Sequence, residues 1–193
     1  MILIDDQIQE YTPEEIARWT DELPEWRRKQ VLAYKNDMGR RQSLLAYRLL
    51  CQGLREEYGI MEQPTFVYNE HGKPSLALPP TGGDGEGLYF SLSHCKEGVC
   101  CAISDRPVGI DIESANRKIS DSVIRYSMNE GEQALIRESD DPQRTFLRLW
   151  TQKEAVLKRL GTGIRDDMRD ILSDHAYTIE VRENERYILS VAW

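Results

Sequence analysis

Two carboxylates at alternate positions in the second half of the chain could hold a metal ion. In the stretch Val-Gly-Ile-Asp-Ile-Glu, residues 108–113, apolar side chains alternate with Asp111 and Glu113. A strand sends alternate side chains to opposite faces, so both carboxylates share one face, roughly 7 Å apart. Two oxygen donors at that spacing can hold one Mg²⁺, which completes its shell with water and phosphate oxygens. An ordinary half-exposed strand explains the same pattern, and both interpretations stay open.

A helix predicted further along the chain adds a third carboxylate and a lysine. Trp150, Glu154 and Lys158 recur every four residues, so they share one stripe of that helix. On a free surface, Glu154 and Lys158 would form an ion pair worth about 0.3–0.5 kcal/mol. Combined with the two carboxylates of the strand, they could instead complete a magnesium site and serve a phosphate reaction.

A hydroxyl and an imidazole, Ser93 and His94, follow one another at a predicted strand end. Both groups can contact phosphate oxygens, although a histidine of this kind can also be structural. A Ser-His-Asp hydrolase is a poor alternative, because adjacent strand residues point to opposite faces. The sequence also has neither a G-x-S-x-G elbow nor a glycine-rich phosphate loop.

Strands and helices alternate along the chain, which favours an α+β fold. The expected strands are 1–4, 65–68, 88–93, 98–104, 108–113, 177–181 and 186–193, and the expected helices are 13–22, 44–58, 121–126, 128–138 and 142–160. Thr12 and Pro13 mark one helix start, and Ser127 is expected to cap the helix 128–138. The turn 104–107 is the best internal boundary, so we predict two parts, 1–106 and 107–193.

The composition excludes several classes of protein. The 193 residues are 40% hydrophobic and 30% charged, as in a folded globular chain, and the net charge of −8 argues against binding to nucleic acid or to an anionic membrane. No segment approaches the ~20 apolar residues of a membrane span. The four cysteines form no CxxC pair, so we expect a reducing cytoplasmic location. One stretch, 25–48, is cationic, with seven basic residues against two acidic ones.

Taken in order, these motifs resemble those of the 4′-phosphopantetheinyl transferases. The similarity rests on the strand 108–113, on the segment from Trp150 to Lys158, and on the Gly-Thr-Gly-Ile that ends at Ile164. Gly-Lys-Pro at 72–74 and Phe-Ser-Leu-Ser-His at 90–94 are similar to that family's upstream motifs. The length is similar to the two-half type, such as the surfactin-synthetase-activating enzyme, and differs from the short trimeric carrier-protein synthases.

The resemblance implies a fold and a reaction. The fold would be two similar α+β halves related by a pseudo-twofold axis, with coenzyme A in the cleft between them. The reaction would transfer 4′-phosphopantetheine from coenzyme A to a serine hydroxyl of an apo acyl or peptidyl carrier protein, releasing adenosine 3′,5′-bisphosphate. A monomer is expected, because such a cleft is complete within one chain.

By position, the resemblance also implies roles for the carboxylates and the lysine. Asp111, Glu113 and Glu154 would hold Mg²⁺ on the pyrophosphate, with Glu154 also the base for the carrier serine. Lys158 would stabilise charge on the phosphates. Such a reaction needs charge neutralisation and in-line positioning more than covalent help.

Further upstream, the resemblance implies contacts to coenzyme A. The residues it places there are Lys73, Ser93, His94 and Lys158, together with a basic residue for the 3′-phosphate, for which Arg41 is preferred over Lys35 and Arg40. Carrier proteins of this family's partners are usually acidic, so docking onto an acidic enzyme would need a local basic or apolar patch. Arg125, Tyr126 and Met128 are our candidate for that patch, with core packing as the equally open alternative.

Two other functions remain open on the sequence. A magnesium-dependent phosphodiesterase or nuclease could use the same three carboxylates and lysine. The acidic composition and the Gly-Lys-Pro and Ser-His motifs argue against it. A binding module that holds coenzyme A or a carrier without turnover should have lost a carboxylate or the lysine, and none is missing.

Overall fold

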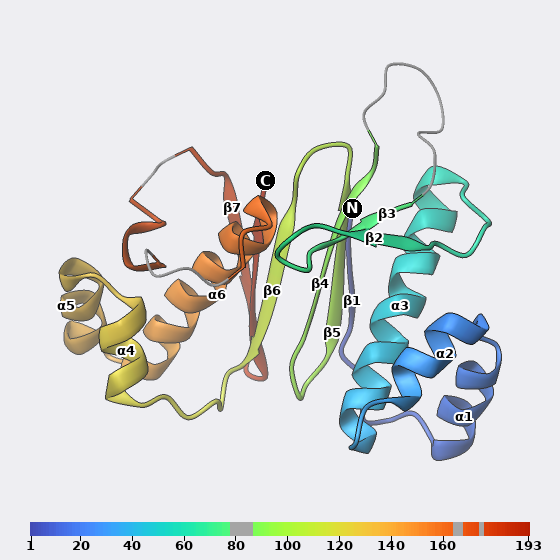
Figure 1. Ribbon diagram of the computed structural model, residues 1–193. Helices are drawn as coiled ribbons and strands as arrows, with labels where there is room; N and C mark the ends of the chain where they lie inside the picture. Colours follow the sequence, from blue (N-terminus) through green and yellow to red (C-terminus); the bar gives the residue numbers. More distant parts are fainter. Residues whose placement is uncertain (78–86, 164–167, 174–175) are drawn as a thin grey trace.

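Helices flank a central pair of sheets in the computed structural model, which describes residues 1–77, 87–163, 168–173 and 176–193 (Figure 1). The helices are α1 (Pro13–Asp21), α2 (Glu25–Leu32), α3 (Asp37–Tyr58), α4 (Asp121–Ser127), α5 (Glu130–Glu138) and α6 (Pro142–Leu160), followed by a 3-10 turn η1 (Met168–Asp170). The strands are β1 (Ile2–Asp5), β2 (Phe66–Tyr68), β3 (Pro74–Leu76), β4 (Tyr89–His94), β5 (Val99–Ser104), β6 (Gly109–Ser114), β7 (Ile179–Glu183) and β8 (Tyr187–Ala192). This mixture confirms the predicted α+β class.

The two larger sheets repeat one topology. One has the strand order β1-β5-β4 and the other β6-β8-β7, and every pairing in them is antiparallel. In each sheet the first strand pairs with the last, and a long helix, α3 or α6, precedes the second strand. The chain passes from one sheet to the other at residues 105–108. A separate hairpin, β2–β3, projects from the first part of the chain.

Apolar side chains fill the space between the two sheets. Cys100 and Ala102 of β5 pack with Ile110 and Ile112 of β6, and all four are buried. The outer face of the first sheet packs on α3 through a second apolar cluster. The outer face of the second sheet packs on α6, where Ala155 and Val156 meet the end of β8. Figure 1 accordingly shows α1–α3 on one side of the sheets and α4–α6 on the other.

Serine hydroxyls join the two sheets where β4 meets β6. Because β6 is the edge strand of its sheet, alternate backbone N–H groups point away from its partner β8. The N–H of Ile110 donates to Ser91 Oγ at 3.1 Å, and that of Ile112 donates to Ser93 Oγ at 3.4 Å. These bonds satisfy buried donors that no strand pairs with, and they fix β6 against β4.

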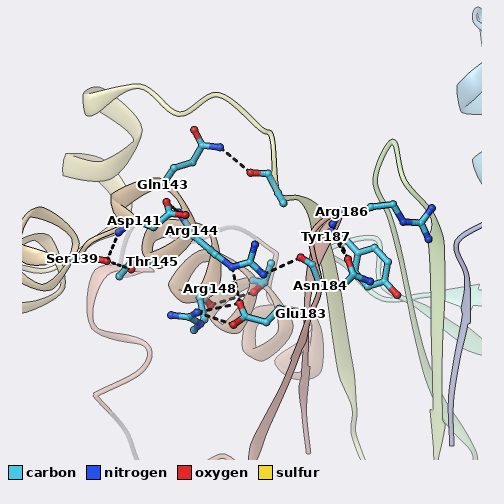
Figure 2. A network of polar contacts seen from close by, with 12 residues as sticks. Ser139, Asp141, Gln143, Arg144, Thr145, Arg148, Glu183, Asn184, Arg186 and Tyr187 are labelled. Atoms are coloured by element: carbon cyan, nitrogen blue, oxygen red, sulfur yellow. Dashed lines mark hydrogen bonds and ion pairs between the residues drawn. The ribbon is translucent and has the colours of Figure 1, made fainter.

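Polar contacts to the β7–β8 hairpin set the position of α6. Asp141 caps the helix by accepting from the Arg144 N–H at 2.9 Å. Arg144 and Arg148 both pair with Glu183, at 3.3 and 2.9 Å, and Arg144 Nη2 donates to the carbonyl of Asn184 (Figure 2). The helix ends at Gly161, whose φ of 73° is left-handed and therefore suits glycine. The predicted bounds 142–160 are confirmed.

Three details of the chain differ from expectation. The basic stretch forms the separate helix α2 and the start of α3, which begins at Asp37 behind an Asn36 cap. Asn129, rather than Ser127, caps α5, with Glu132 completing the capping box. The strand β3 was not expected. The stretch 79–87, rich in proline and glycine and therefore predicted to be a loop, lies almost wholly outside the described residues. None of the helices in the described part of the chain combines the length and apolarity that a bilayer crossing requires.

Candidate active site

Asp111, Ser93 and Lys158 form a closed group of hydrogen bonds at the junction of the two sheets. Asp111 lies on β6 and is 5% exposed. Its Oδ1 accepts from Ser93 Oγ at 2.8 Å and from Lys158 Nζ at 2.7 Å, and Lys158 Nζ also donates to Ser93 Oγ at 2.8 Å. Burial opposes the charge on Lys158, but the nearby Asp111 carboxylate outweighs it and raises the lysine pKa. Lys158 of α6 therefore contacts both β4 and β6.

Two buried carboxylate oxygens at this group have no hydrogen-bond partner. They are Asp111 Oδ2 and Glu154 Oε1. Burial, and then the charge of Asp111, raises the pKa of Glu154. Buried unpaired carboxylate oxygens are costly, so a cation is the partner that this arrangement fits. Within the described residues, however, no three metal-ligating side chains come close enough to form a ready cluster.

Glu113, the third predicted ligand, already has a cationic partner. Arg117 pairs with its carboxylate and also lies over the Trp150 ring, 5.2 Å from the centroid. Burial, with the charge of Asp111 second, nevertheless raises the pKa of Glu113 to about 7. Arg117 was not among the residues selected from the sequence, although its place four residues after Glu113 was the available signal.

A pocket of about 310 Å³ extends from these groups toward the β2–β3 hairpin. Glu154 and Lys158 lie on its wall, together with Ser91, Phe90 and the predicted Lys73. Figure 1 shows the hairpin reaching across to the C-terminal end of α6. There the Lys73 ammonium donates to the carbonyl of Arg159 at 3.0 Å, so the amine itself is bonded to the helix end. Burial, and next the charge of Arg159, lowers the Lys73 pKa.

His94 is the last residue of β4, and Arg41 lies near the start of α3. His94 is exposed, whereas Ser93 is buried, which confirms that the two point to opposite faces. Partial burial, and then the Lys158 ammonium, lowers the pKa of His94, so the imidazole is neutral near pH 7. Arg41 Nη1 donates to the carbonyls of Ile8 and Tyr11, at 3.3 and 2.6 Å. It therefore holds the loop after β1.

The other basic candidates point elsewhere or are exposed. Arg40 donates through Nε to the carbonyl of Tyr34 at 2.9 Å, and Lys35 is exposed. Of the predicted docking patch, Tyr126 is 52% exposed, as a docking residue requires. Met128 follows the alternative of core packing, because this side chain is 0% exposed and packs beside Phe146.

Two polar residues that organise the site were not predicted from the sequence. Ser91 binds the N–H that precedes Asp111, and its spacing to Ser93 was the only signal. Lys153 is 0% exposed, and its Nζ pairs with Glu132 at 2.8 Å and donates to the carbonyls of Met168 and Arg169. This lysine ties α5 and η1 to α6, next to Glu154.

The fold and the site define an α+β protein with a carboxylate and lysine centre between two sheets of equal topology. Residues 107–191 match the family model of the 4′-phosphopantetheinyl transferase superfamily. This segment contains β6 and α6, which carry Asp111, Glu113, Glu154 and Lys158. Residues 107–191 are therefore similar to that superfamily.

Curated relatives agree with this assignment. The chain is 34% identical over 128 residues to the 4′-phosphopantetheinyl transferase psf-1 of Bacillus pumilus, covering 64% of this chain and 52% of the relative. It is 30% identical over 141 residues to the 4′-phosphopantetheinyl transferase gsp of Aneurinibacillus migulanus, which covers 72% of this chain and 56% of the relative. It is 32% identical over 101 residues to the 4′-phosphopantetheinyl transferase Sfp of Bacillus subtilis, which covers 51% of this chain and 42% of the relative. The chain spans about half the length of these relatives.

Proposed function

We propose that this protein transfers 4′-phosphopantetheine from coenzyme A to a serine hydroxyl of an apo acyl or peptidyl carrier protein. The reaction would depend on Mg²⁺ and would release adenosine 3′,5′-bisphosphate. The observation that carries the proposal is the junction of β4, β6 and α6, where Asp111 and Glu154 each leave a buried oxygen unpartnered beside Lys158. The superfamily match over residues 107–191 supports the same reaction.

Glu154 is our candidate for the base that takes the proton of the carrier serine. Its raised pKa makes the ionised carboxylate a stronger proton acceptor than an exposed glutamate. If its unpartnered Oε1 binds the metal ion, the other oxygen of the carboxylate would accept the hydroxyl proton. A rigid position on α6 favours this role, because proton transfer requires hydrogen-bond distance to the attacking oxygen.

Lys158 is our candidate for stabilising charge on the phosphates. Its ammonium is charged at neutral pH, because Asp111 raises its pKa. The same bond to Asp111 and that to Ser93 hold the ammonium at the pocket wall. A fixed positive group stabilises developing charge without reorganisation at the moment of reaction.

The proposed metal site uses Asp111, Glu113 and Glu154. The unpartnered oxygens of Asp111 and Glu154 fit a cation that prefers oxygen ligands. Glu113 could join them only after leaving Arg117. When bound, Mg²⁺ would neutralise charge on the pyrophosphate oxygens and orient them.

Four residues remain our proposal for coenzyme A contacts: Lys73, Ser93, His94 and Arg41. Lys73 borders the pocket beside Lys158. Ser93 has its hydroxyl bound to Asp111 and Lys158, so it would also position them. A bound phosphate would favour the protonated imidazole of His94 and so raise its lowered pKa. Arg41 would have to exchange a backbone carbonyl for the 3′-phosphate.

We propose that the protein acts as a monomer of two parts, 1–106 and 107–193, related by a pseudo-twofold axis. The repeated strand order supports the division into two parts. The pocket is lined by residues of both parts, which supports a site that one chain completes. A reducing cytoplasm is the proposed location, which the four free cysteines support. We also propose that nucleic acid is not a partner of this protein.

Intact-mass spectrometry of an apo carrier protein tests the proposal. The carrier is incubated with the protein, coenzyme A and Mg²⁺, beside Glu154→Gln, an EDTA sample and the control Glu138→Gln. Glu138 is an exposed carboxylate at the end of α5, so its substitution removes the same charge away from the site.

A mass gain of one phosphopantetheine group is expected with the wild type and with Glu138→Gln, and not with Glu154→Gln or EDTA. No gain on several carriers, with coenzyme A still bound, would favour a binding module. Hydrolysis of a phosphodiester substrate under the same conditions would instead favour the phosphodiesterase.

A further inference from the structure

Arg117 is the resident counter-ion of a carboxylate that the proposed metal site needs. It lies in the turn after β6, where its backbone N–H donates to the carbonyl of Ser114 at 3.0 Å. Its guanidinium pairs with the carboxylate of Glu113 and lies over the ring of Trp150. Glu113 belongs to β6, whereas Trp150 lies on the stripe of α6 that also carries Glu154.

The three carboxylates of the site are not equivalent. Asp111 shares its Oδ1 with Lys158, and Asp111 Oδ2 and Glu154 Oε1 are buried without partners. Glu113 alone is paired with an arginine. A divalent cation that reached Glu113 would meet the guanidinium at the same carboxylate, and two positive groups at that distance repel one another.

Of the two basic side chains at the site, Arg117 is the easier to displace. Lys158 has two hydrogen bonds, to Asp111 and Ser93, and its side chain is 30% exposed. Arg117 is 38% exposed, and partly exposed ion pairs contribute little net stability. Its second contact, with the Trp150 ring, does not require Glu113.

Space for the released side chain is present beside the site. A pocket of about 270 Å³ is lined by Arg117, Lys118, Ile119, Ser120, Val123 and Phe146. The guanidinium can therefore turn away from Glu113 into this pocket without a change in the positions of β6 and α6.

We propose that Arg117 is a positioning residue which occupies Glu113 in the metal-free protein and is displaced when a divalent cation binds. Arg117 thereby weakens the affinity of the site for the metal and supplies a cation to the Glu113 carboxylate while the metal is absent. This inference rests on the proposed function, because it uses the metal site assigned there.

Direct titration with Mn²⁺, followed by the electron paramagnetic resonance signal of the free ion, tests the proposal without turnover. The proteins compared are the wild type, Arg117→Met, Arg117→Lys and Arg137→Met. Arg137 is exposed in the last turn of α5, so its variant removes one positive charge away from Glu113. We expect the Mn²⁺ Kd of Arg117→Met to fall about three- to tenfold, with Arg117→Lys close to wild type and Arg137→Met unchanged.

A double variant distinguishes a positioning role of Arg117 from a merely structural one. In Glu113→Gln, the Arg117→Met substitution should no longer change the Mn²⁺ Kd, because its effect acts through the Glu113 carboxylate. An unchanged or higher Kd for Arg117→Met in the otherwise wild-type protein would overturn the proposal. Absence of Mn²⁺ binding in every variant would overturn it too, and the carrier mass assay would then show separately whether the transfer reaction stands.

Discussion

A methyl group on Gly109 would separate the two elements that carry the site. Gly109 begins β6, and a Cβ there would lie 1.9 Å from the carbonyl oxygen of Ala155 and 2.4 Å from the backbone nitrogen of Arg159. Such contacts need at least 3.0 Å, so Gly109→Ala would force β6 and α6 apart by about 1 Å. Both obstructing atoms belong to backbone, which cannot turn aside as a side chain can.

The cost of this separation follows from overpacking and from misplacement. Overpacking should lower the free energy of unfolding by about 3 kcal/mol, and the Tm of a chain this long by roughly 6–12 °C. The bond of 2.7 Å between Lys158 Nζ and Asp111 Oδ1 would stretch beyond hydrogen-bond length. A shift of 1 Å can lower a reaction rate about 10²-fold.

Thermal unfolding and the carrier mass assay, applied to the same protein sample, measure both effects. The matched control is Gly131→Ala, where the methyl would meet only Asn129 Oδ1, at 3.5 Å. In the helix α5 that change should stabilise by about 0.5–1 kcal/mol. A Gly109→Ala protein with the Tm and the transfer rate of the wild type would refute the close approach of β6 and α6.

Three further predictions concern the buried charges. Lys158→Met should lower the free energy of unfolding by about 3 kcal/mol in urea titrations, because Asp111 is left buried and unpaired. Adding Asp111→Asn should restore much of that lost stability. If it restores none, the two side chains are not paired. Lys153→Met should cost a similar 3–5 kcal/mol, since Glu132 loses its partner; a Tm equal to wild type would speak against this. The raised Glu113 pKa means that the native state holds a proton longer than the unfolded state, so without metal the free energy of unfolding should fall as pH rises from 4.5 to about 7. Urea titrations in EDTA should show this slope, and Glu113→Gln should flatten it.

Local signals in the sequence located most of the elements and the principal side chains. The Thr12 cap and the left-handed Gly161 set helix ends that need no tertiary information. Alternation along β6 placed Asp111 and Glu113 on one face, and the four-residue spacing placed Glu154 and Lys158 on one stripe. Such periodicity depends on the geometry of the single strand or helix, so it can be predicted without knowledge of the tertiary structure.

The structure differed from the prediction where contacts between distant parts of the chain determine the local structure. Ser127 and Asn129 both have a glutamate three residues later, and Asn129 became the cap because Met128 is extended and buried in the core. The pairing of Glu113 with Arg117 depends on the Trp150 ring from another element. Ser91 acquires its function only when β4 and β6 meet. The spacing of Arg117 to Glu113 and of Ser91 to Ser93 was visible in the sequence, but it did not show which partners these side chains would meet.

The serine bonds between β4 and β6 have a consequence for how the two sheets remain separate. A continuous backbone ladder between these strands would merge the sheets into one and would close the seam beside the pocket. A hydroxyl accepts the outward N–H of Ile110 or Ile112 but adds no ladder of its own. The edge of β6 is thus denied to strands of other molecules, which readily add to bare edges and start aggregation. The seam that holds Asp111 therefore also protects the protein against self-association, while leaving the pocket beside it accessible to a ligand.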